Sequence, residues 1–179
     1  MEFGLTSSVI NRAKIKEIEV IKEDDYRFIW EVNYANICGK MVLIFVHVDT
    51  RYSMIYTDIK ASVWKNPKLF FSNVIELALR REGFSNSEIK EYLYLAGEVS
   101  FTKTHGAKAS GGMKHLTTYL SYYDKILVDG MFQPFITDYV NDELCNIGIH
   151  PSLKYFCPKE FFVKRIKELL EEYSNKGTN

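Results

Sequence analysis

The chain has 179 residues, with 23 Lys or Arg and 23 Asp or Glu, so its formal net charge at pH 7 is zero. This neutrality argues against a general polyanion binder, which is usually basic overall. A chain of this length buries enough surface to fold as one domain without disulfides or metals. Aromatic residues make up 15% of the chain, while 4 Pro and 10 Gly are too few for a disordered or low-complexity protein.

The N-terminal segment and the cysteines exclude several classes of protein. The first residues contain no apolar stretch long enough for a signal peptide. The longest apolar run, 41–48, is too short to span a bilayer as a helix, so no membrane association is expected. Cys38, Cys145 and Cys157 are odd in number and form no CxxC, which supports neither a zinc site nor a redox pair. Free thiols fit a reducing compartment, so we expect a cytoplasmic protein without metal or cofactor.

The first third of the chain predicts strands. Residues 1–25 are ambiguous between strand and helix. Residues 26–34 alternate between apolar and polar side chains, which predicts a half-buried strand. Residues 41–48 are apolar at almost every position, as in a central strand, and 52–59 predict a third strand. Because short turns join these three segments, we expect an antiparallel meander.

The rest of the chain predicts mostly helices. Asn66-Pro67 is a helix start and Gly83 a helix stop. Ser85 and Glu88 form a capping box for a second helix, which Gly97 ends. The remaining expected elements are a fourth strand over 98–103, a third helix starting at Ser110, and helices over 134–147 and 158–174. Early strands and late helices predict a single α+β domain over 1–179, with an antiparallel sheet of four to five strands covered by about five helices.

One window of the chain is basic in an otherwise neutral protein. No carboxylate occurs between Glu98 and Asp124, and the order is strand, Gly-containing loop and helix N-terminus. A helix N-terminus attracts anions, and glycines let a phosphate approach the backbone. The candidate anion-binding residues are Lys103, Thr104, His105, Lys108, Ser110, Gly111, Gly112 and His115. The alternative is a solvated basic loop with Ser110 as the N-cap, since the window contains no P-loop motif.

Other candidate residues carry a weaker signal. Arg51 lies at a hairpin turn from which it can reach a ligand, and Asn33 lies on the strand face opposite Trp30. His47, inside the central strand, is predicted to be a hydrogen-bonded core histidine. No catalytic group is assigned, and the histidines lack the spacing of a helical metal pair.

Five segments stand out together: Trp30 followed by Asn33, the apolar run after Lys40, Thr50-Arg51-Tyr52, Phe101-Thr102-Lys103-Thr104 and Ser110-Gly111-Gly112-Met113. Their combination resembles an uncharacterised family of bacterial and phage proteins, a domain of unknown function. The resemblance covers a core of 26–125, leaving 126–179 as a helical extension packed on it. This chain departs from the family pattern in having Gly111-Gly112-Met113-Lys114 for Gly-Ser-Met-Asn, and Ala107-Lys108 where an arginine is common. The resemblance implies no activity, but it implies one shared feature that contains Trp30, Asn33, Lys103, Thr104, Lys108 and Gly112.

Three function hypotheses remain open at this point. The first is a binding module for a phosphorylated, nucleotide or nucleic-acid ligand at the basic loop 102–115, with tyrosines of the following helix for stacking. These are Tyr119, Tyr122 and Tyr123. The second is an interaction protein, such as a phage inhibitor of host defence or a toxin–antitoxin partner. The third is an enzyme with His105 or His115 as general acid–base.

Overall fold

A computed structural model describes the chain except residues 38, 123–126, 147–154 and 177–179. Cys38 and Tyr123 therefore lie outside the described residues. The described elements are β1 (Glu2–Leu5), α1 (Ser7–Ala13), η1 (Tyr26–Phe28), β2 (Ile29–Ile37), β3 (Lys40–His47), β4 (Ser53–Thr57), η2 (Val63–Lys65), α2 (Pro67–Arg81), α3 (Asn86–Ala96), β5 (Ser100–Lys103), α4 (Ala107–Leu120), α5 (Pro134–Asp142) and α6 (Pro158–Lys176).

The five strands form one sheet in the order β4-β3-β2-β1-β5. Strands β2, β3 and β4 make the predicted antiparallel meander, and the α+β class is confirmed. The sheet is mixed rather than wholly antiparallel, because β1 runs parallel to both β2 and β5. All four residues of β1 are buried, including the charged Glu2, and the strand is too short to stand out in the sequence. The ambiguous N-terminal segment thus supplies a strand inside the sheet.

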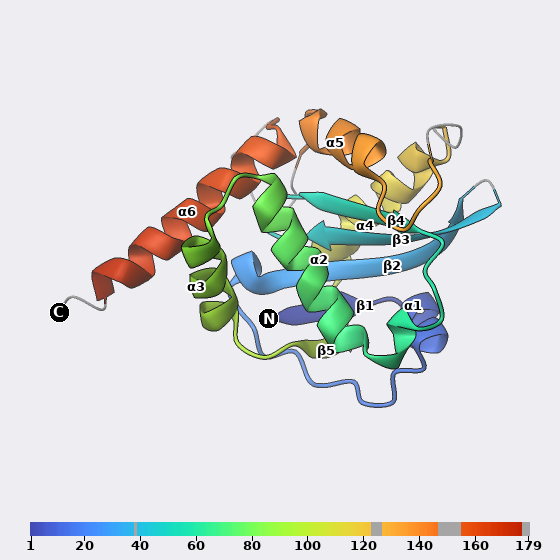
Figure 1. Cartoon of the computed structure of the whole chain (residues 1–179), viewed down its shortest axis with the longest axis horizontal. Coiled ribbons are helices and arrows are strands. Elements are labelled where there is room, and N and C mark those ends of the chain that lie inside the picture. Colours follow the sequence, from blue (N-terminus) through green and yellow to red (C-terminus); the bar gives the residue numbers. More distant parts are fainter. Residues whose placement is uncertain (38, 123–126, 147–154, 177–179) are drawn as a thin grey trace.

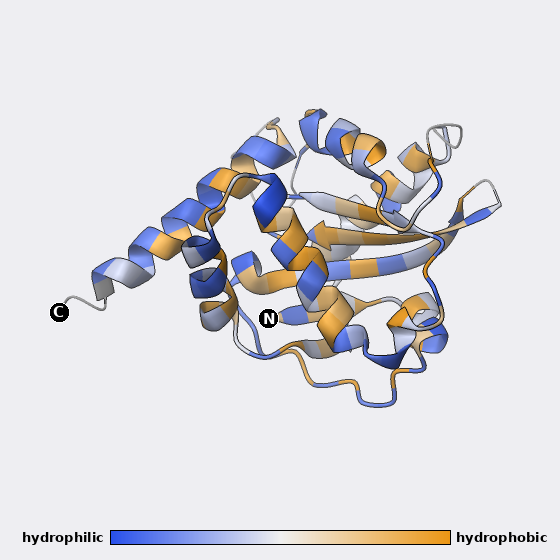
Figure 2. Cartoon of the chain, viewed as in Figure 1, coloured by the Kyte–Doolittle hydropathy of each residue, from blue (hydrophilic) through white to orange (hydrophobic). Residues whose placement is uncertain are grey.

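Helices cover both faces of the sheet (Figure 1). Leu43 and Phe45 of β3 belong to the larger core cluster, which includes residues of α2, α3 and α6. Val42 and Ile44 belong to a second cluster, which includes residues of α4 and α5. Because both faces of β3 are buried, its sequence is apolar at successive positions, and β3 forms a hydrophobic band in Figure 2. The predicted interior strand is confirmed.

Helices α2 and α3 begin and end where their capping residues predict. The Asn66 side chain accepts a hydrogen bond from the Leu69 amide at 3.2 Å, and α2 begins at Pro67, as predicted. The Ser85–Glu88 capping box is present at the start of α3. Gly83 has a φ of 82°, which favours glycine over residues with a side chain after the last turn of α2.

Later helices differ from the prediction. Helix α4 begins at Ala107, not at Ser110, and its N-cap is Gly106. The Ser110 hydroxyl donates to the Gly106 carbonyl at 2.8 Å, so it satisfies a backbone acceptor inside the helix instead of capping the amide groups. Helix α5 ends at Asp142 rather than at 147. The part of the chain that the structure describes has six α-helices, and none of its helices is long and apolar enough to cross a membrane.

Replacing Ile44 by Asp is expected to prevent folding. The Ile44 side chain is fully buried between β3 and the helices α4 and α5, so the new carboxylate is left without solvent or a cation. Met41 lies on the same strand and is 40% exposed, so Met41→Asp is the matched control. Thermal melting followed by circular dichroism measures both variants. Cooperative melting of Ile44→Asp near the wild-type temperature would contradict the buried placement of this strand face.

Replacing Ser85 by Ala is expected to lower the free energy of unfolding by about 1 kcal/mol. The substitution removes the hydroxyl that accepts from the Glu88 amide at 3.3 Å. Ser62 is the exposed N-cap of η2 and makes no capping hydrogen bond with its side chain, so Ser62→Ala controls for the change in side chain. Urea denaturation measures the difference, and equal stabilities of the two variants would show that the cap does not stabilise α3.

Candidate functional site

A cavity of about 560 Å³ lies beside α4, on the sheet face that α4 and α5 cover. Helical spacing of three and four residues brings one side of α4 to it. The α4 residues that line it are Ala107, Lys108, Gly111, Gly112, His115, Leu116 and Tyr119. The volume is within the range of small-molecule sites, about 300–1,000 Å³.

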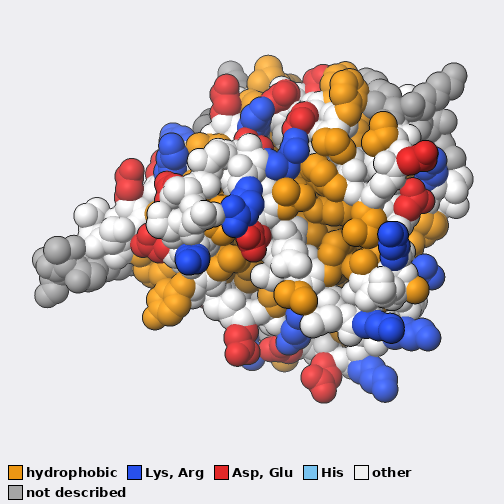
Figure 3. Space-filling model, viewed as in Figure 1, with side chains coloured by type: hydrophobic (Ala, Val, Ile, Leu, Met, Phe, Trp, Pro, Cys, Tyr) orange, Lys and Arg blue, Asp and Glu red, His pale blue; other side chains and the backbone are white. Residues whose placement is uncertain are grey.

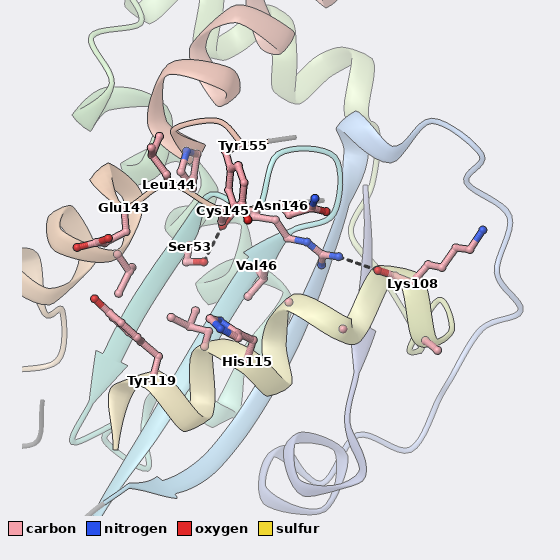
Figure 4. Close-up of a pocket in the computed structure, with 17 residues that line it drawn as sticks. Val46, Ser53, Lys108, His115, Tyr119, Glu143, Leu144, Cys145, Asn146 and Tyr155 are labelled. Carbon is pink, nitrogen blue, oxygen red and sulfur yellow. Dashed lines mark hydrogen bonds between the residues drawn. The ribbon is translucent and has the colours of Figure 1, made fainter. Parts of the chain in front are cut away.

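The opposite wall comes from the segment after α5. In Figure 4, His115 and Tyr119 lie on α4, across from Glu143 and the neighbouring Leu144. Val46 of β3 contributes to the floor of the cavity. The lining is mainly apolar and aromatic, with a few polar groups between, which is typical of sites for small organic ligands.

Arg51 is the buried cation in the cavity wall. Its residue is 8% exposed, and it lies in the hairpin between β3 and β4 with a φ of 63°. Its guanidinium donates to the Lys108 carbonyl at 2.7 Å and to the Ala109 carbonyl, so it fastens the first turn of α4 to the hairpin. Among the described residues no carboxylate forms an ion pair with it. Burial lowers the pKa of Arg51, and Cys145 and Glu31 offset only part of that effect.

Arg51 also explains one of the two adjacent glycines of α4. A Cβ atom on Gly112 would lie 2.7 Å from Arg51 Cδ, so no side chain fits there without moving the arginine. The Arg51 side chain packs against Gly112, so a ligand that approaches this glycine also meets the arginine. A Cβ atom on Gly111, in contrast, has no atom within 4 Å. Gly111 is the position where α4 leaves open space.

His105 points into the protein instead of toward the cavity. Its Nδ1 lies 3.0 Å from Glu31 Oε1 and its Nε2 lies 3.1 Å from Glu2 Oε2. All three side chains are almost fully buried, at 5%, 0% and 6% exposure for His105, Glu31 and Glu2. The backbone amide of His105 also donates to Glu31 Oε1 at 2.7 Å. Because both ring nitrogens are engaged, His105 is a structural histidine and not a free general acid–base.

Gly4 makes room for this buried cluster. A Cβ atom at Gly4 would lie 2.7 Å from each carboxylate oxygen of Glu31 and from Nδ1 of His105. The carboxylate of Glu2 is fixed from the other side by the backbone amides of Lys22 and Glu23, at 2.8 and 2.9 Å. Burial lowers the pKa of His105, but the hydrogen bonds and charges of Glu31 and Glu2 outweigh it and raise the pKa overall.

The remaining predicted site residues lie away from the cavity. Lys103 is exposed, and Thr104 is half-buried in the loop before α4. Asn33 accepts from Thr6 Oγ1 at 3.0 Å and donates to Thr117 Oγ1 at 3.3 Å, which ties β2 to the start of α1 and to α4. The predicted residues that do meet at the cavity are Arg51, Lys108, Gly111, Gly112 and His115.

The second cavity wall was not predicted from the sequence. It includes Glu143, Leu144, Cys145, Asn146 and Tyr155. The exposure of two large apolar residues, Leu144 at 67% and Tyr155 at 74%, is the feature that distinguishes this wall in the structure. Burial raises the pKa of the Cys145 thiol to about 11, so it stays protonated and is no nucleophile at neutral pH. Among the described residues no group of three His, Cys, Asp or Glu side chains is arranged to hold a metal.

His47 is the hydrogen-bonded core histidine that the sequence predicts. Its Nε2 lies 3.0 Å from the Arg27 carbonyl and therefore carries the proton, while Nδ1 lies 2.8 Å from the Thr50 hydroxyl. Burial lowers its pKa to about 4, so it is neutral at pH 7. Its neighbour Asp49 pairs with Arg165 of α6 at 2.6 Å, so this acid fixes α6 to the hairpin.

Comparison with known proteins places the chain in a family. The model of a domain of unknown function, DUF6933, matches residues 2–161. The chain belongs to this family. The resemblance to an uncharacterised family is thereby confirmed, and the DUF6933 region is longer than the expected core of 26–125. The curated proteins contain no match to the chain.

The DUF6933 fold does not gather all six residues of the expected shared feature. Lys108 and Gly112 line the cavity, whereas Trp30 is fully buried in the core on the other face of the sheet. Asn33 faces α4, as expected from its position opposite Trp30, but it bonds to threonines there. Strand alternation separates Trp30 from Asn33, because residues of one strand that are an odd number of positions apart point to opposite faces of the sheet.

The contribution of His105 to stability is expected to decrease as pH rises. Its folded pKa is raised above 6.5, so its stabilisation is fully present below pH 6.5 and is lost as pH rises through the folded pKa. Urea denaturation of the wild type and His105→Gln between pH 5.5 and 9 measures the difference. The exposed His115, changed to Gln, is the control for the substitution itself. A His105 pKa below 6.5, measured by NMR titration, would contradict this interpretation.

Proposed function

We propose that the chain binds a small anionic organic ligand, such as a nucleotide or another phosphorylated metabolite, in the cavity beside α4. The observation that carries the proposal is the buried guanidinium of Arg51, which has no carboxylate partner among the described residues and lies in the wall of a mainly apolar cavity. Taking an unpaired charge out of water is costly, and a bound anion offsets that cost.

The start of α4 adds further attraction for an anion. Helix α4 has 14 residues, and its N-cap Gly106 has no side chain to accept from the first-turn amides. Ala107 and Lys108 of this first turn line the cavity. Arg51 and this first turn lie on one wall, whereas Glu143 lies on the other. The Lys108 side chain extends from the turn away from the cavity, so its positive charge acts on a ligand from a distance. This polarity favours a ligand whose negative group lies toward the first turn of α4.

The other end of the cavity suits a flat apolar group. Tyr119 and His115 come from α4, and Tyr155 lies across from them. Aromatic rings stack on nucleobases and other planar groups, and this stacking does not depend on a particular hydrogen-bond pattern. Leu116 and Val140 complete the apolar lining. A concave site with one positively charged wall supports a small ligand over an extended nucleic acid, which agrees with a net charge of zero.

The alternative function is an enzyme, for which the sequence predicts two candidate acid–base groups. Of the two candidate acid–base groups, His105 has both ring nitrogens bound to buried carboxylates. His115 alone of the two lines the cavity, with Glu143 on the opposite wall. A catalytic function at this site would therefore use His115.

Replacing Gly111 by Leu is expected to block the cavity without destabilising the fold. The new side chain enters open space, and Leu is a better helix former than Gly by up to about 1 kcal/mol. Calorimetric titration with a panel of nucleoside phosphates and sugar phosphates tests binding. We expect at least one of these compounds to bind the wild type, and to bind Gly111→Leu at least tenfold more weakly. The matched control is Thr118→Leu, an exposed position of α4 outside the cavity lining.

Two outcomes would contradict the proposed function. One is that no compound of the panel binds the wild type or raises its melting temperature. The other is that the same compound binds Gly111→Leu and wild type with equal affinity, which would place the binding site elsewhere. Lys108→Ala is expected to weaken binding while leaving the melting temperature nearly unchanged, since an exposed lysine contributes little to stability.

A further inference from the structure

A second hollow, separate from the cavity beside α4, lies between the end of α1 and η2. Its volume is about 510 Å³, and its lining consists of Arg12, Ala13, Lys14, Ala61, Trp64 and Lys65. We propose that this hollow binds a phosphate group. The proposal concerns a different part of the molecule from the proposed function and does not depend on it.

The three cations of the hollow have no counter-charge in the protein. Arg12, Lys14 and Lys65 form no ion pair with any described residue, and no carboxylate lines the hollow. Figure 3 shows Lys and Arg side chains gathered at the lower right of the molecule, over α1. In a chain with equal numbers of acidic and basic residues, such a local surplus of positive charge marks a place for an anion.

The negative C-terminal ends of the two helices neutralise only part of this positive charge. Arg12 lies in the last turn of α1 and Lys14 is its C-cap, and Lys65 ends η2. The C-terminal end of a helix carries roughly half a negative elementary charge, and less in a short helix. Two such ends supply at most about one negative charge against three full positive charges. The hollow therefore retains a positive surplus that an anion neutralises.

Aromatic contacts hold the walls of the hollow in place. The Arg12 guanidinium lies 5.9 Å from the centre of the Tyr34 ring, in the geometry of a cation–π contact. Trp64 packs edge-on against the same Tyr34 ring, with centroids 6.1 Å apart. Because the buried Tyr34 ring contacts both Arg12 and Trp64, it restricts both side chains beside the hollow. Less side-chain entropy is then lost when an anion binds.

The kinds of cation present favour a phosphate over a simple halide. A guanidinium presents a planar set of donors that matches two oxygens of a phosphate, and the two ammonium groups add compact charges from two different segments. Trp64 adds an apolar wall beside these charges. The recognised chemistry is thus a phosphate or diphosphate group carried by a small molecule.

The two tryptophans of the chain make the test direct. Trp64 lines the hollow, whereas Trp30 is fully buried in the core and serves as an internal reference. The probes are inorganic phosphate and pyrophosphate, titrated at constant ionic strength against sodium chloride. The readout is the pair of indole N–H signals in a two-dimensional NMR spectrum, assigned with Trp64→Phe. We expect a saturable shift of the Trp64 signal, larger with phosphate or pyrophosphate than with chloride, and no shift of Trp30.

Two double variants decide whether the hollow causes the shift. Arg12→Gln with Lys65→Gln is expected to weaken phosphate binding at least tenfold. Lys90→Gln with Lys167→Gln removes the same charge from exposed positions elsewhere and is expected to leave binding unchanged. Gly111→Leu, which fills the cavity beside α4, is expected to show the same Trp64 shift with phosphate as the wild type. An unchanged Trp64 signal in the wild type, or equal affinities of the two double variants, would overturn the proposal.

Discussion

The buried contact of His105 with Glu2 and Glu31 is the constraint around which this fold is arranged. Two carboxylates with almost no solvent exposure are tolerated in the sheet because an imidazole lies between them and can carry the opposing charge. The contact joins β1, β2 and the loop after β5, and it requires a glycine at position 4, where any Cβ would collide with it. The N-terminal strand is therefore held inside the sheet by a polar contact as well as by its apolar side chains.

The same contact determines where α4 begins. His105 is drawn inward by its ring and by its backbone amide, and the chain turns at Gly106, with a φ of 89°, directly into the helix. The first turn of α4 then lies against the hairpin, where its carbonyls accept from Arg51. Arg51 adopts a left-handed backbone conformation that is unfavourable for a residue with a side chain. The buried cluster and the strained arginine together position the helix that forms one wall of the cavity.

The two candidate anion sites differ in how their charge is placed. At the cavity the key cation is buried, is held by backbone carbonyls and stands beside apolar walls, so a ligand there gains from burial as well as from charge. At the hollow near α1 the cations are exposed and the attraction is mainly electrostatic, so salt screens it strongly. A neutral chain thus concentrates positive charge locally on two separate surfaces.

The sequence by itself determined the elements whose signals are local. The meander, α2 and α3 follow from alternation, helical spacing and caps within a few residues. The basic window of the sequence contains Lys108, Gly111 and His115, but it did not indicate that all three lie on one helix beside a cavity. Only the tertiary structure decided the rest. Strand β1 has only four residues and is buried on both faces, and His105 contacts Glu2 across 103 residues. Arg51 reaches α4 across 57 residues, and the second cavity wall follows α5. These contacts leave no periodic trace in the sequence, because they depend on how distant segments pack and not on the conformation of neighbouring residues.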